Sequence, residues 1–217
     1  MHLLKEYGNT YVEVEKSFKK NIFKFKNQSI GNTLETILKN TIEKFSNLVK
    51  QVKPDLIVLH GDRVESLACA LVGSLNHILT AHIEGGEVSG NIDDSIRHAV
   101  TKLCHAHFVG NKLAKLRVIN MGEKKSNVFQ IGSADIDVML SKNLKPIKKV
   151  KKHYEIPFDS YAILLWHPVT SEISQLKSDT IRLVKFVNDS PENFIVINSN
   201  NDPGTNIILN CYKKKLN

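Results

Sequence analysis

Two short runs of histidine, acidic and glycine residues hold the side chains best suited to chemistry. The first is His60-Gly61-Asp62-Arg63, and the second is His82-Ile83-Glu84-Gly85-Gly86-Glu87. Carboxylates that converge from neighbouring strand ends suit the removal and return of a proton, and glycines let a backbone approach a ligand closely. The alternatives are a helix N-cap at Asp62 and a solvated acidic loop at Glu84.

Further candidate residues lie at an expected helix start and at the end of a later expected strand. Asp93 and Asp94 stand at an expected helix start, where capping and the helix dipole explain them without a function. Arg97, a turn later, either faces the same cleft or pairs with these acids. His167, before Pro168, is a candidate contact for a phosphate or hydroxyl group or a histidine of an ordinary turn.

Several classes of site are disfavoured by missing motifs. The sequence has neither an HExxH spacing nor a CxxC pair, so no metal site is predicted. Neither a P-loop nor a G-x-G-x-x-G run after an expected strand occurs, which disfavours a nicotinamide-dependent dehydrogenase. We therefore expect no cofactor. The three widely separated cysteines fit a reducing, cytoplasmic compartment.

The charge of the chain does not favour a nucleic-acid partner. The formal net charge is +8, but much of the excess lies in residues 142–152 and 213–215, which are expected to form a linker and a tail. Arginine, which is preferred for bidentate contacts to bases and phosphates, occurs only four times. Because no apolar run approaches the ~18 residues that span a bilayer, no membrane partner is expected either.

The elements that must position the polar clusters alternate between strands and helices. Apolar spacing predicts helices at 30–52, 64–75 and 112–121 with a capped helix start at 93–98, and strands at 55–60, 78–83, 106–109 and 128–131. This order predicts a parallel sheet with helices on both faces. Ligands bind outside the carboxyl ends of such strands, and both polar clusters, as well as Gly132 with Ser133, fall there.

A second unit is expected after a Lys- and Pro-rich stretch. Strands at 161–166 and 194–197 flank a helix at 174–188. The expected organisation is a partial Rossmann-like domain at 1–143, a linker at 144–156, and the beginning of a second Rossmann-like domain at 157–217.

The motifs are specific enough to resemble a known family. Residues 60–68 (HGDRVESLA) and the longer run His82–Leu103 resemble the hydrolysing UDP-N-acetylglucosamine 2-epimerases of sialic-acid-type sugar synthesis. His167-Pro168-Val169-Thr170 and Asn200–Gly204 resemble the interdomain and second-domain motifs of that family. The resemblance covers nearly the whole chain.

The resemblance implies a GT-B-like α/β fold with a UDP-sugar bound between two Rossmann-like domains, and a homo-oligomer in the intact form. It implies elimination of UDP to give a 2-acetamidoglucal, then addition of water with inversion at C2. The product is free N-acetylmannosamine or a diacetamido analogue, and no metal or nicotinamide is required. Matched by motif, the catalytic carboxylates are Asp62, Glu84 and Asp93. Residues expected near the substrate are His60, Arg63, His82, Glu87, Arg97, His167 and Asn201.

Parts of the family pattern are missing from this sequence. The family's opening strand with its Gly-Thr-Arg-Ala-Glu-type loop and its later Gly-Asn-Ser-Ser-type loop are not found, so we expect a chain truncated at both ends, with little activity alone. The alternatives are an epimerase acting on a diacetylbacillosamine nucleotide, a fragment that only binds a nucleotide sugar or a partner chain, and a GT-B glycosyltransferase.

Overall fold

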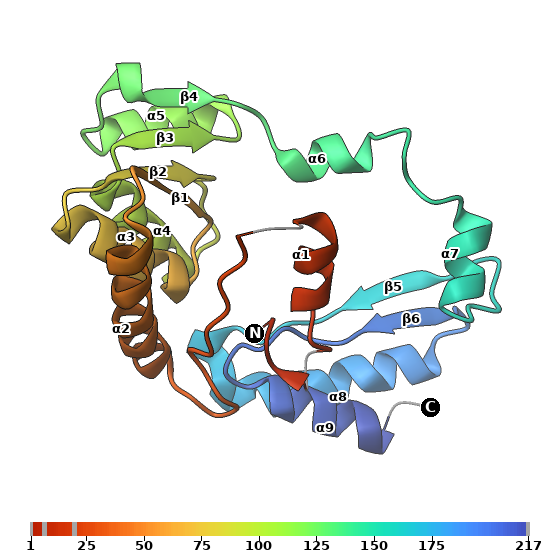
Figure 1. The fold of residues 1–217 in the computed structure, drawn as a ribbon. Coiled ribbons are helices and arrows are strands. Elements are labelled where there is room, and N and C mark those ends of the chain that lie inside the picture. Colours follow the sequence, from red (N-terminus) through yellow and green to blue (C-terminus); the bar gives the residue numbers. More distant parts are fainter. Residues whose placement is uncertain (1, 6–7, 19–20, 216–217) are drawn as a thin grey trace. The chain divides into compact units, whose positions relative to one another are not determined.

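The computed structural model describes residues 2–5, 8–18 and 21–215. The chain divides into two compact units, one ending at Ser141 and the other beginning at Lys142. Each unit contains its own parallel sheet (Figure 1). An α/β fold is therefore confirmed, and each unit is described by itself.

The sheet of the first unit has four parallel strands in their sequence order. These are β1 (Leu56–His60), β2 (Leu79–Ile83), β3 (Ala106–Val109) and β4 (Val128–Gln130). Its helices are α1 (Tyr11–Ser17), α2 (Leu34–Val52), α3 (Val64–Leu75), α4 (Ile92–Leu103), α5 (Lys112–Asn120) and α6 (Ala134–Met139). The strand predictions are confirmed to within one residue at each end, and α3 has the predicted bounds.

The helix predicted at 30–52 begins later than expected. Gly31 has a φ of +81° and Thr33 is extended, so regular helix starts only at Leu34. At the other end Lys53 adopts a left-handed conformation before Pro54, whose ring disfavours a helical residue before it. Residues 30–33 thus belong to the chain that leads into α2.

The prediction of helices on both faces of this sheet is wrong for the described residues. Leu59 is in register with His82 and His82 with His107, so these side chains point to one face. On that face Leu59 packs in a core with α2, α3 and α4 residues, and Val109, two residues after His107, packs against α5. Consecutive right-handed crossovers in one direction put every connecting helix on the same side.

The opposite face of the sheet is apolar and exposed. Leu56 and Val58 of β1, Leu79 of β2 and Phe129 of β4 each expose about half of their surface. Phe129 stacks on Phe108 with ring centroids 5.5 Å apart. The strands therefore carry apolar side chains on both faces, as strands of a sheet covered on both sides do.

A matched pair of leucines on β1 tests this one-sided core. Leu59→Ala is expected to lower the free energy of unfolding by about 2–5 kcal/mol, because Leu59 is only 6% exposed within the core. Leu56→Ala removes the same atoms from a side chain that is 51% exposed, and is expected to cost less than about 1 kcal/mol. Urea unfolding followed by circular dichroism measures both; equal losses would show that the second face is covered in solution.

The second unit is a smaller α/β layer. Its parallel strands are β5 (Ala162–Leu165) and β6 (Phe194–Ile197), and its helices are α7 (Ile147–His153), α8 (Ile173–Asp189) and α9 (Thr205–Lys215). Leu176, Val184, Ile208 and Tyr212 form its core. The segment predicted as a linker, 144–156, contains α7, which has no buried residue. Among the described residues no helix is long and apolar enough to span a membrane.

Candidate functional site

A cavity of about 530 Å³ lies at the carboxyl ends of β2, β3 and β4. It is lined by Glu84, Glu87, Gly110, Asn111, Gly132, Ser133, Ile136 and Asp137. Three of its lining side chains are carboxylates, and two come from the second predicted cluster. The edge of the sheet that the sequence marks for ligand binding is thus hollow and acidic.

Glu84 has a fixed position at this cavity. It is a non-glycine residue with a φ of +65°, a conformation that costs of the order of 1–3 kcal/mol and is concentrated at functional sites. Its N–H donates to the carbonyl of Phe108 at 2.8 Å. Its Oε2 lies 2.9 Å from Nε2 of His60, at the end of the neighbouring strand β1. These contacts favour a positioned carboxylate over a solvated loop.

Glu87 is held from the end of the next strand by Asn111, which is not among the residues predicted from the sequence. Nδ2 of Asn111 donates to Oε1 of Glu87 at 2.9 Å, while Oδ1 of Asn111 accepts from the N–H of Ala114 and caps α5. Asn111 follows β3 directly after Gly110, so the strand-end rule that located the other clusters also applies to it. Asp137 was missed as well, because α6 was not predicted.

Gly86 serves close packing within the protein. It has a φ of +79°, and a Cβ there would lie 2.5 Å from the carbonyl oxygen of Ala114 in α5. Its own carbonyl accepts a hydrogen bond from Arg117. The close approach that this glycine permits is therefore to α5, whereas the sequence suggested an approach to a ligand.

Asp62 belongs to an ion-pair group with α4. Its carboxylate accepts from Arg97, which also lies 3.4 Å from Oδ1 of Asp94. The N-cap of α3 is Arg63, so the alternative interpretation of Asp62 as the cap is wrong. Arg97 is 9% exposed, so two carboxylates offset the cost of burying its charge.

Asp93 and its neighbour Asp94 have different surroundings. Asn91 caps α4 by accepting from the N–H of Asp93 at 2.9 Å, and the Asp93 side chain is half-buried. Asp94 accepts from the N–H and hydroxyl of Ser89 and from the N–H of Gly90. Hydrogen bonds from the Gly90 and Ser89 backbones lower the pKa of Asp94. Asp94 therefore fixes the loop before α4, and Asp93 is the acid of this pair that remains a candidate for catalysis.

The hydrogen bonds of Asp94 give a paired prediction. Asp94→Asn is expected to lower the thermal midpoint, because an amide in place of one carboxylate oxygen turns an N–H toward the Ser89 or Gly90 donors. Glu43→Gln, which removes one carboxylate charge from an exposed position of α2, is expected to leave the midpoint nearly unchanged. Because the folded-state pKa of Asp94 is lowered, its stabilisation is present above the unfolded pKa and is lost as the pH falls through the folded-state pKa. Thermal unfolding at pH 7 and pH 3 measures both effects; equal midpoints for the two variants at pH 7 would contradict the assignment.

His82 lies inside the protein. Its side chain has no exposed surface. Nε2 lies 2.9 Å from the carbonyl oxygen of Gly61, and Nδ1 lies 3.0 Å from the hydroxyl of Thr101. Burial lowers the pKa of His82 to about 4, so the ring is neutral at pH 7. The ring therefore has no exposed atom with which to make the predicted contact with a substrate.

The remaining predicted residues lie at two separate strand ends. Nε of Arg63 is 3.5 Å from Oε2 of Glu65 on α3. In the second unit His167 follows β5, and its Nδ1 accepts from the N–H of Asn200 at 3.1 Å. Asn201 follows in the same turn after β6. The second unit thus also places its polar residues at the carboxyl ends of its strands.

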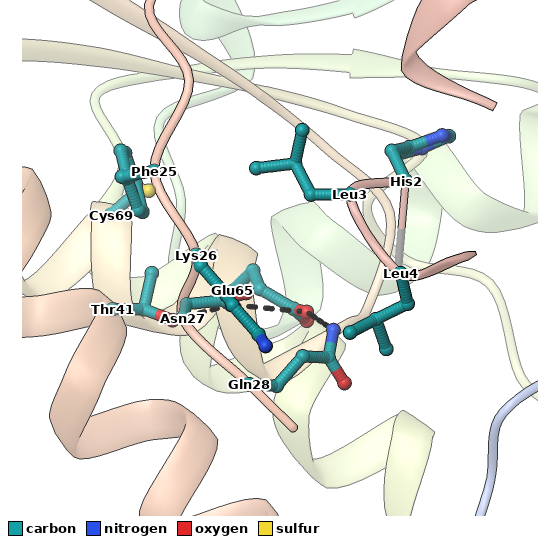
Figure 2. A pocket seen from close by; sticks show the side chains of 10 residues that line it. All are labelled: His2, Leu3, Leu4, Phe25, Lys26, Asn27, Gln28, Thr41, Glu65 and Cys69. Atoms are coloured by element: carbon teal, nitrogen blue, oxygen red, sulfur yellow. Dashed lines mark hydrogen bonds between the residues drawn. The ribbon is translucent and has the colours of Figure 1, made fainter. Parts of the chain in front are cut away.

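A second cavity of the first unit, about 220 Å³, holds none of the predicted site residues (Figure 2). Four of its polar side chains bind one another: Oε1 of Glu65 accepts from Asn27 and Gln28, and Asn27 also donates to Thr41. Burial raises the pKa of the Cys69 thiol in its wall to about 12, so this thiol is not a nucleophile at neutral pH. We assign no ligand to this cavity. The described part of the chain contains no cluster of three or more metal-ligating side chains.

The sequence model of the family described as UDP-N-acetylglucosamine 2-epimerase matches residues 1–217. The chain belongs to this family. One relative of this chain is the UDP-N-acetylglucosamine 2-epimerase of Neisseria meningitidis serogroup B. The two are 44% identical over 209 residues, which make up 96% of this chain and 55% of the relative. The GDP/UDP-N,N'-diacetylbacillosamine 2-epimerase (hydrolyzing) of Campylobacter jejuni is 32% identical over 213 residues, 96% of this chain and 56% of the relative.

Solved structures confirm the GT-B-like fold class of the epimerase-family chain. The UDP-GlcNAc 2-epimerase from Neisseria meningitidis bound to UDP-GlcNAc superposes with a TM-score of 0.73 at 19% identity, over 95% of this chain and 60% of that one. The UDP-GlcNAc 2-epimerase from Methanocaldococcus jannaschii in complex with UDP-GlcNAc and UDP superposes with a TM-score of 0.71 at 22% identity. The superposition covers 85% of this chain and 53% of that one. The chain spans little more than half the length of the curated relatives that it matches.

Proposed function

We propose that these residues carry the acid–base groups of a hydrolysing 2-epimerase that converts UDP-GlcNAc to UDP and N-acetylmannosamine. The observation that supports this most is the acidic cavity at the ends of β2–β4, with Glu84 in a constrained conformation at its wall. Family membership supplies the substrate class. Relatives 32% and 30% identical are named as hydrolysing enzymes, which supports water as the second reactant.

The proposed reaction has two steps that balance. In the first, a carboxylate takes the proton from C2, the bond from C1 to the diphosphate oxygen breaks, and UDP leaves as a C1–C2 double bond forms. In the second, water adds its hydroxyl to C1 and gives its proton to a carboxylate, while a carboxylic acid returns a proton to the other face of C2. Asp62, Glu84 and Asp93 are proposed to share these proton transfers.

The other predicted contacts have different support. We propose that His60 and Glu87 face the sugar, because they adjoin Glu84 and the cavity. Arg97 is proposed to hold Asp62, and Arg63, His167 and Asn201 to contact the diphosphate or nucleotide. A sialic-acid-type pathway is proposed because a relative that is 30% identical is named Polysialic acid biosynthesis protein P7. A cytoplasmic location and a homo-oligomer are proposed from the sequence alone.

Two other assignments remain candidates. A UDP- or GDP-diacetylbacillosamine substrate is supported by the names of two relatives. A chain that binds nucleotide sugar without turning it over is supported by the exposed apolar sheet face, since a partner chain that covers it would be needed for a fully enclosed core.

The test uses the chain and a chimera in which it replaces the matching part of the Neisseria serogroup B relative. Each is incubated in D₂O with UDP-GlcNAc, and in parallel with UDP-diacetylbacillosamine, and the products are followed by NMR. Free UDP with a 2-epimerised sugar that carries deuterium at C2 is the expected result. Binding of UDP-GlcNAc without UDP release by either form would favour the binding-only assignment, and release of an epimerised sugar still attached to UDP would exclude the hydrolysing reaction.

A further inference from the structure

A single buried ring connects the turn after β1 to helix α4. His82 on β2 contacts the Gly61 carbonyl through Nε2 and the Thr101 hydroxyl through Nδ1. A carbonyl oxygen only accepts hydrogen bonds, so Nε2 carries the proton and Nδ1 accepts from the hydroxyl. Thr101, like His82, has no exposed surface, which excludes water as a competing partner at this contact.

The turn that the ring contacts carries two of the proposed site residues. The N–H of Gly61 donates to the carbonyl of Ile83 at 3.0 Å, and its carbonyl accepts from His82, so β2 holds Gly61 from both sides. The two flanking residues, His60 and Asp62, contact Glu84 and Arg97 respectively. The position of Gly61 therefore sets the position of both pairs.

The loop after β2 packs on the same ring. A Cβ at Gly85 would lie 3.0 Å from both Nδ1 of His82 and Oγ1 of Thr101. A separation of 3.0 Å is tighter than most real Cβ contacts. The absence of a side chain at Gly85 therefore lets the ring and the hydroxyl pack against the backbone of this loop. Gly85 directly follows Glu84, and its contact connects a third part of the site to the ring.

We infer that His82 is a positioning residue, which as a neutral bridge between Thr101 and Gly61 holds Asp62 and Glu84 in their places at the strand ends. The role deepens the proposed function and rests on it for its catalytic consequence. The bridge itself is a property of the folded chain.

Other charged groups near the ring favour the same neutral state. His60 on β1, Arg97 on α4 and His107 on β3 all oppose a positive charge on His82, and burial opposes it most. Glu123, the carboxylate near this layer, instead contacts His107 and Lys102. A ring that stays neutral keeps one donor and one acceptor, which the bridge needs.

The test compares Thr101→Val, which keeps the size of the side chain without its hydroxyl, with Thr101→Ser, which keeps the hydroxyl. In the ¹⁵N-labelled chain, His82 is expected to show the Nε2–H tautomer and no proton uptake between pH 8 and pH 5. Thr101→Val is expected to shift the amide resonances of Gly61, Asp62 and Gly85, and Thr101→Ser to leave them near their original positions. Gly85→Ala, which presses on the ring without changing a hydrogen-bonding group, is expected to shift the Gly61 and Asp62 amides too.

The second readout is the turnover rate, which is measured in the chain or in the chimera, depending on which of them is active. Thr101→Val is expected to lower kcat about tenfold with little change in KM, because a displaced carboxylate slows the chemical step, and Thr101→Ser is expected to restore most of it. An Nδ1–H tautomer, or Gly61 and Asp62 amides that do not respond to Thr101→Val and Gly85→Ala, would overturn the inference. If no form of the parent turns over, the proposed function fails while the NMR result still decides the bridge.

Discussion

Glu84→Gln is expected to slow UDP release from UDP-GlcNAc by about 10²- to 10⁴-fold, the usual contribution of a positioned general acid or base. Glutamine keeps the size of the side chain and can still hydrogen-bond with His60, so the backbone conformation of residue 84 should survive. What the substitution removes is the carboxylate that is proposed to take or return a proton at C2. The loss should therefore appear in kcat, with little change in KM or in the thermal midpoint.

The controls for Glu84→Gln come from two other glutamates. Glu43, an exposed residue of α2, gives Glu43→Gln as a variant with the same charge change and no expected effect on turnover. In Glu87→Gln the new amide oxygen can still accept from Asn111, so KM is expected to rise and kcat to fall much less than in Glu84→Gln. The result that counts against Glu84 is a kcat within threefold of the parent, measured by coupled UDP release.

Arg97→Met is expected to lower both stability and turnover. It leaves Asp62 and Asp94 without their shared cation, and removing one partner of a buried pair costs about 3–5 kcal/mol at full burial. The side chains here are 11% exposed for Arg97 and 27% for Asp62, so we expect about 2 kcal/mol in urea unfolding. Turnover should fall as well, since Asp62 loses the group that aims it.

A double-mutant cycle separates the two effects. Asp62→Asn alone is expected to abolish most turnover at a smaller cost in stability, because the amide oxygen still accepts from Arg97. In the double variant Arg97→Met with Asp62→Asn, part of the lost stability should return, since no unpaired carboxylate remains at position 62, while turnover should stay low. Additive stability losses would mean that the Asp62–Arg97 pair is not coupled, and would remove the positional argument for Asp62.

Much of the first unit could be predicted because its strands are short apolar runs with polar residues directly after them. The run before His60 predicts β1, and the run before Glu84 predicts β2, each to within one residue. Parallel pairing then places the two polar clusters at one edge, which is where the cavity lies. Local pattern and simple topology were sufficient for these features.

Features that depend on register or on distant partners could not be predicted in this way. His82 is two residues from Glu84 in a cluster that also holds Ile83 and two glycines. Only the alignment of His82 with Leu59 and His107 shows that its ring points into the core. The sequence allowed two interpretations of Arg97, which either faces the cleft or pairs with the nearby acids. Its bond to Asp62, 35 residues away, depends on how α4 packs beside the end of β1.

The placement of all connecting helices on one face also required information beyond the strand pattern. Alternating strands and helices fit either a sheet that winds in one direction or one that reverses. Only the observed order β1-β2-β3-β4 decides between them. The continuous apolar runs predict buried strands, and the strands are confirmed, but among the described residues helices cover only one face of the sheet.

That strand order has a consequence for how the first unit folds. Each strand pairs only with strands next to it in the sequence, so every pairing closes a loop that contains a single α-helix. Closing short loops costs less chain entropy than joining distant segments, and topologies rich in local contacts fold faster. The sheet can therefore grow from β1 to β4 in the direction of synthesis on the ribosome, and each new strand finds its neighbour already in place.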